Sequence, residues 1–140
     1  MSALPTNALD AVASQLVAAL EKYDGDSGAM IAGWPDLDRY RDVSAQVETI
    51  RMYCSALPDV RVQWVELLIA HAELVHFLWR TQYGVTQDVL EEIGAVRDHH
   101  ADCIAALRNR CLRAVGRGSP APTAELSSVP DRDPKGRAGS

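Results

Sequence analysis

The sequence of 140 residues is poor in the features that define several common protein classes. It contains one Phe and three Cys, and no segment alternates apolar and polar residues as a half-buried strand does. The longest apolar run is interrupted by Glu66, His71, Glu73 and His76, so we expect no membrane span. The N-terminus lacks a basic segment followed by an apolar stretch, so we expect no secretory signal.

The cysteines do not form a disulfide framework. Cys103 and Cys111 fall on one predicted helix, eight residues apart, and eight residues of helix span about 12 Å. A disulfide needs a much shorter separation between the two α-carbons. A reduced protein in the cytoplasm is therefore the simpler expectation.

The charge is acidic overall but unevenly distributed. The net charge is −5, with 14 acidic and 6 basic side chains in residues 1–96. Residues 97–118 hold five arginines against two aspartates. We interpret these arginines as complements to the C-terminal dipole of a helix and to the acidic remainder of the chain. Nucleic acid is therefore not an expected partner, because phosphate binding needs more positive charge.

Apolar residues at helical spacing predict four helices, and Ala and Leu are plentiful. The predicted helices span residues 6–23, 36–57, 59–83 and 86–115. Three glycines and a proline predict a loop over residues 24–35. The sequence therefore predicts an all-α, single-domain bundle of about four helices over residues 1–116, with a long C-terminal helix. The Pro-, Ser- and Gly-rich residues 117–140 predict a disordered tail.

The helix predicted over residues 59–83 is apolar on most sides, with a thin polar stripe. A helix that is apolar nearly all round is usually buried by several neighbours. We therefore expect this helix at the centre of the core. The next helix begins after Thr86, a plausible N-cap residue.

Histidines interrupt two apolar stripes. His71 and His100 lie among apolar residues, and Cys103 follows His100 by three positions. These three residues are candidate ligands for a small molecule or a metal, but only His99 or His100 with Cys103 has the local spacing of a structural zinc site. Glu73 and His76 form a single Glu-x-x-His pair, whereas di-iron bundles use two pairs and two further glutamates. We predict no metal, no cofactor and no catalytic residue; neutral histidines in the core are the main alternative.

Two segments predict a protein partner. The C-terminal helix is longer than the others and carries an apolar stripe with arginines beside it. The residues of this helix predicted to contact a partner are Leu107, Arg108, Cys111, Leu112 and Val115. The predicted loop carries Met30, Ile31 and Trp34, and Met and Trp are enriched at interfaces. The alternative for this loop is that Trp34 folds back over the end of the bundle. An apolar stripe beyond the bundle needs a cover, which a second copy or another protein would provide.

The sequence therefore predicts a non-enzymatic, cytoplasmic helical protein that acts through protein–protein contacts. A regulator, an antiactivator or a chaperone-like adaptor would fit, and a homodimer is expected. The alternative is a helical bundle that binds a small molecule or a metal through His71 and His100.

Overall fold

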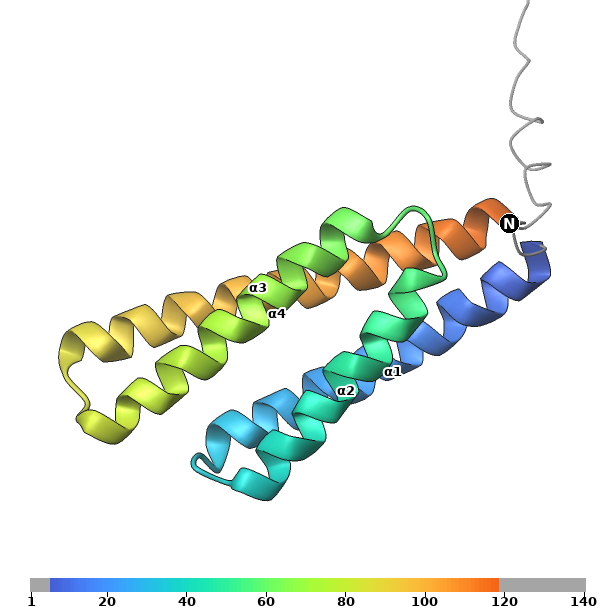
Figure 1. Ribbon diagram of the computed structural model, residues 1–140. Coiled ribbons are helices and arrows are strands. Elements are labelled where there is room, and N and C mark those ends of the chain that lie inside the picture. The colour runs from blue at the N-terminus through green and yellow to red at the C-terminus, as the bar shows by residue number, and fades with distance from the viewer. Residues whose placement is uncertain (1–5, 119–140) are drawn as a thin grey trace, which may run out of the picture.

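The computed structural model describes residues 6–118 as an all-α bundle, which confirms the predicted fold class and the long C-terminal helix (Figure 1). The described elements are α1 (Thr6–Ala32), α2 (Leu37–Ser55), α3 (Arg61–Arg80), the 3-10 turn η1 (Thr81–Tyr83) and α4 (Gln87–Gly118). Within these residues there is no strand, and no helix is long and apolar enough to span a membrane. The predicted tail, apart from residues 117–118 at the end of α4, lies outside the described residues.

The loop predicted at residues 24–35 is wrong over most of its length, because α1 continues to Ala32. Gly25 and Gly28 lie within this helix, although each glycine in a helix interior costs about 1 kcal/mol relative to alanine. Burial of an apolar side chain outweighs that penalty: Met30 is fully buried near the end of α1. The Lys22–Asp26 ion pair, with a distance of 2.8 Å, adds a contact one helical turn apart.

The four helices run up and down, and α1 and α4 form the central pair. α1 packs against α2 and α4, and α4 packs against α1 and α3, whereas α2 and α3 make few contacts with each other. The predicted place of residues 59–83 at the centre of the core is therefore wrong. α3 lies on the outside of the bundle, and its apolar residues are covered on one side only.

Capping interactions fix where α2 and α4 begin. Asp36 precedes α2, and its carboxylate accepts a hydrogen bond from the backbone N–H of Arg39 at 3.1 Å. The hydroxyl of Thr86 accepts one from the backbone N–H of Val89 at 3.2 Å, which confirms Thr86 as an N-cap. Gly84 separates η1 from α4 with φ of 124°, a conformation that side-chain-bearing residues rarely adopt.

Candidate functional site

A buried polar cluster occupies the middle of the bundle and contains both predicted histidines. The Tyr23 hydroxyl of α1 lies 2.7 Å from His71 Nδ1 of α3 and 2.7 Å from His100 Nε2 of α4. Tyr23 is fully buried, and only 4% of His100 is exposed. The cluster therefore joins three helices by two short hydrogen bonds.

The number of available protons restricts how this cluster is bonded. A phenol carries one proton, so at most one of the two imidazoles accepts it. The other imidazole must donate its own N–H to the phenol oxygen. The contacting nitrogen of each histidine is thus occupied by Tyr23, and a ligand at either nitrogen would have to displace that bond.

Burial keeps all three side chains in their neutral forms at neutral pH. It raises the pKa of the Tyr23 phenol well above its usual range and lowers the pKa of His71. For His100, burial is the main reason that the pKa falls to about 4, and the nearby His71 contributes further. A neutral, hydrogen-bonded cluster in the core stabilises packing between helices, as expected for core histidines.

Cys103 does not join this cluster. Its thiol lies 3.6 Å from Nε2 of His99, the exposed histidine that precedes His100. Across residues 6–118, no group of three or more His, Cys, Asp or Glu side chains has an arrangement that could hold a metal ion. Burial raises the pKa of the Cys54 thiol to about 12 and that of Cys111 to about 11, which disfavours the reactive thiolate.

The predicted partner-binding residues of α4 are mostly used within the chain. Leu107 and Cys111 are fully buried, and Val115 is partly buried against the same core. Arg108 donates from Nε and Nη2 to Oε2 of Glu21 on α1, at 3.2 Å and 3.0 Å. Leu112 remains exposed, with 44% of its surface accessible.

The predicted partner-binding residues near the end of α1 also face the protein. Met30 is fully buried, and Ile31 and Trp34 pack against the core while partly exposed. The Trp34 ring meets Trp79 of α3 edge to face, with centroids 4.8 Å apart, and contacts Tyr40 of α2 at 6.2 Å. Trp34 therefore folds back over the end of the bundle, which leaves only its exposed edge for a partner.

A group of exposed apolar side chains lies on α3 instead. Val62, Val65 and Ile69 are 62%, 43% and 54% exposed, and Leu68 beside them is 40% exposed. Ala72 continues the same surface toward the C-terminal half of the helix. We call these five residues the outer face of α3. The sequence does not reveal this surface, because a helix that is apolar nearly all round gives no sign of which side lacks a neighbour.

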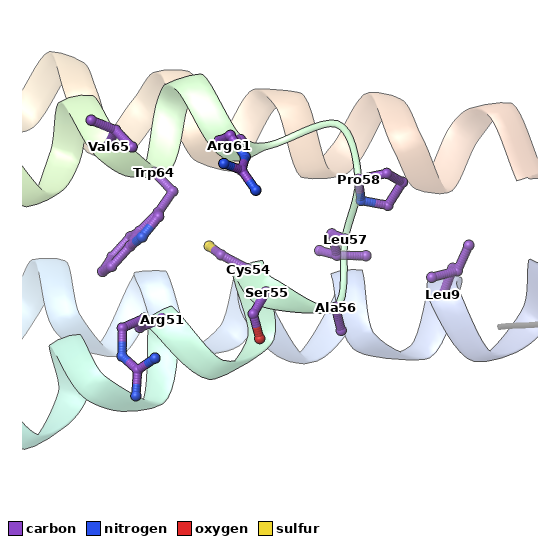
Figure 2. A pocket seen from close by; sticks show the side chains of 10 residues that line it. All are labelled: Leu9, Arg51, Cys54, Ser55, Ala56, Leu57, Pro58, Arg61, Trp64 and Val65. Atoms are coloured by element: carbon purple, nitrogen blue, oxygen red, sulfur yellow. The ribbon is translucent and has the colours of Figure 1, made fainter. Parts of the chain in front are cut away.

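A pocket lies beside the connection between α2 and α3 (Figure 2). Its volume is about 760 Å³, and its lining is formed by Leu9, Arg51, Cys54, Ser55, Ala56, Leu57, Pro58, Arg61, Trp64 and Val65. Figure 2 shows the Trp64 ring and the Cys54 thiol in the space between the two helices, with Arg61 above them. The lining combines apolar groups with two arginines and, among the described residues, no carboxylate. Such a lining suits a small molecule with an apolar body and an anionic group.

Comparisons with protein-family models, with curated proteins and with solved structures found no match to this chain. Function is therefore inferred from the geometry and chemistry of the residues described above.

Proposed function

We propose that this chain is a non-enzymatic helical protein that acts by binding protein, and that the outer face of α3 is its contact surface. One observation carries the proposal: neighbouring apolar side chains on one helix are 40% to 62% exposed. Scattered exposed apolar residues are ordinary, but a contiguous patch is typical of a protein interaction site. Regulators, antiactivators and adaptors of this size work through such surfaces.

The alternative function at the histidines has less support from the geometry. His71 and His100 already bind Tyr23 through the nitrogens that face the core. Their lowered pKa values follow mainly from burial, which core packing by itself produces. The cluster therefore has the properties of a structural element, whereas the outer face of α3 is exposed.

The test is co-purification with tagged protein from the native host. We compare the wild type with Ile69→Asp, which places a charge on the outer face of α3, and with Leu112→Asp as the matched control. Leu112 is similarly exposed but lies on α4. Each variant is first checked for wild-type helicity by circular dichroism.

The expected result is selective loss of the same proteins from Ile69→Asp and their retention by Leu112→Asp. A buried charge at a contact surface lowers affinity by about tenfold or more. Equal recovery of every partner by all three proteins would contradict the proposal. Loss from Leu112→Asp alone would transfer the contact surface to α4.

A further inference from the structure

Five exposed residues of α3 lie along one stripe on the side of the helix that faces away from the core. Val62, Val65, Ile69, Ala72 and His76 are all exposed and succeed one another at steps of three, four, three and four. This is a repeat of seven residues, with apolar side chains at its first and fourth positions, named a and d. The core residues Leu67, Leu74 and Leu78 lie on the opposite side of the helix.

A seven-residue repeat has a specific structural meaning. An undistorted helix has 3.6 residues per turn, so a stripe repeating every 3.5 residues is the seam along which two helices supercoil. A helix that covers a globular core usually has a broader apolar face instead. α3 has both surfaces: one side packs within the bundle, and the other carries the exposed a and d residues, with Leu68 beside them and no covering helix among the described residues.

The side chains at position a favour two parallel helices. Val62 and Ile69 occupy this position and are both β-branched, a choice that favours two-stranded parallel pairs. His76 is the third residue at position a, and a single polar residue there sets the register at some loss of stability. The seam therefore carries features that specify both the number of helices and their alignment.

The charges beside the seam favour the same alignment. Arg61 lies on one edge, and Glu66 and Glu73 lie on the other. In a parallel pair each edge meets the opposite edge of the second helix, five residues further along. Arg61 of one copy then approaches Glu66 of the second copy, and the two-fold axis repeats the contact. In an antiparallel pair the acidic edges meet each other. Among the described residues Arg61 has no ion pair within its own chain.

We infer that the outer face of α3 binds a second copy of this chain, and that the two α3 helices pair in parallel and in register as a two-stranded coiled coil. The inference rests on the proposed function, because it names the protein that occupies the same surface. The seam ends at Trp79, the next position d, whose ring already packs against Trp34.

The first experiment measures the mass of the purified full chain by size-exclusion chromatography with light scattering over a range of concentrations. The wild type and Leu112→Asp are expected as dimers, and Ile69→Asp as a folded monomer with wild-type circular dichroism. A folded wild type that remains monomeric at the highest concentration overturns the inference. The proposed function then still stands if Ile69→Asp loses a different protein in the co-purification test.

The second experiment determines the direction of pairing from variants that each add one cysteine on the seam, under oxidising conditions. Val62→Cys and His76→Cys lie at the two ends of the seam, which are about 21 Å apart along a helix. Parallel pairing predicts a disulfide dimer from each variant alone, since each residue meets its own counterpart. Antiparallel pairing places position a of one helix opposite position d of the other, so it predicts little disulfide from either variant alone and a disulfide when Val62→Cys is mixed with Ala72→Cys, which a mass tag on one of them reveals.

Two controls complete the design. Ile69→Cys lies midway between the two ends and faces its own counterpart in the parallel alignment, so it should crosslink as the two end variants do. The wild type reports the background from Cys54, Cys103 and Cys111, which are buried and free. A disulfide confined to the mixture overturns the parallel alignment. Failure of Ile69→Cys to crosslink, with its fold intact, overturns the parallel, in-register contact.

Discussion

Two apolar stripes in this molecule differ in their burial: one is buried and the other is exposed. The stripe on α4 that contains Leu107 and Cys111 is fully buried within the chain. The stripe on α3 that contains Val62 and Ile69 is more than half exposed at both positions. The sequence predicts the reverse, with the α4 stripe in need of a cover and α3 at the centre of the core.

The difference comes from where the neighbouring helices extend, and not from the stripes themselves. α1 runs antiparallel to α4, so the part of α1 that precedes its glycines faces the C-terminal part of α4, where Glu21 bonds to Arg108 (Figure 1). α2 makes few contacts with α3, so the outer side of α3 has no equivalent neighbour. Whether a stripe is buried or exposed is thus decided by where another helix lies.

Charge substitutions in the two stripes should separate them most strongly. Leu107→Asp places a carboxylate at a fully buried position, and it should lower the free energy of unfolding by several kcal/mol or prevent folding. Ile69→Asp should change the unfolding free energy of the monomer by less than about 1 kcal/mol, because surface substitutions usually have small effects. Urea unfolding followed by circular dichroism, at protein concentrations where the chain is monomeric, compares the two. Similar losses from both variants would show that the α3 stripe is also covered within the chain.

The buried cluster of Tyr23, His71 and His100 should make the free energy of unfolding depend on pH. The folded pKa of His100 is lowered to about 4, whereas an unfolded histidine titrates near about 6.5. Between these values the unfolded chain binds more protons, so the free energy of unfolding falls as the pH falls from about 6.5 toward 4. Above about pH 6.5 the contribution of the neutral His100 to the free energy of unfolding is fully present. Protonation of the unfolded chain removes at most about 3 kcal/mol of this free energy at lower pH.

The variant His100→Gln tests this pH dependence, because an amide does not titrate and can still bind the Tyr23 hydroxyl. Its free energy of unfolding should fall less steeply between pH 7 and pH 4.5 than that of the wild type, when both are measured by urea unfolding. His99→Gln is the comparison variant: His99 is exposed and contributes least to the lowered pKa of His100, so its removal should reduce the slope only slightly. Identical slopes for the wild type and His100→Gln would show that His100 is not the group that resists protonation.

The smallest expected effect concerns the C-terminal segment of α1, which continues through two glycines. Gly28 lies in the helix, and a methyl group at its α-carbon would meet no atom within 4 Å. Gly28→Ala should therefore raise the free energy of unfolding by about 1 kcal/mol, through the better helix propensity of alanine. Gly84→Ala should lower it by about 1 kcal/mol or more, because φ at Gly84 is 124°. Thermal unfolding of both variants provides the comparison; destabilisation by Gly28→Ala would indicate that this segment is not helical in solution.

Much of the fold follows from the sequence because helical periodicity is a local property. The number of helices, the long C-terminal helix and the Thr86 cap depend on residues within a few positions of one another. The continuation of α1 does not, because glycines indicate a turn locally, whereas the burial of Met30 that favours helix depends on the rest of the bundle. Tertiary packing thus outweighs local propensity at this segment.

The candidate site is less predictable for the same reason. That His71 and His100 lie in apolar stripes is visible in the sequence, but their common partner Tyr23 is 48 and 77 residues away. The repeat at Val62, Val65, Ile69 and Ala72 is also visible, yet a second apolar side on the same helix hides it. Only the exposed fractions distinguish the seam from the core.

The aromatic cluster of Trp34, Tyr40 and Trp79 has an optical consequence. It brings residues of α2, α3 and the α1–α2 connection within 6.2 Å of one another, at the opposite end of α3 from the pocket. Since α2 and α3 otherwise make few contacts, these rings connect the α1–α2 hairpin with the α3–α4 hairpin. Two indoles in edge-to-face contact give the protein an intrinsic chromophore pair, whose near-ultraviolet dichroism and emission report whether the rings are in contact.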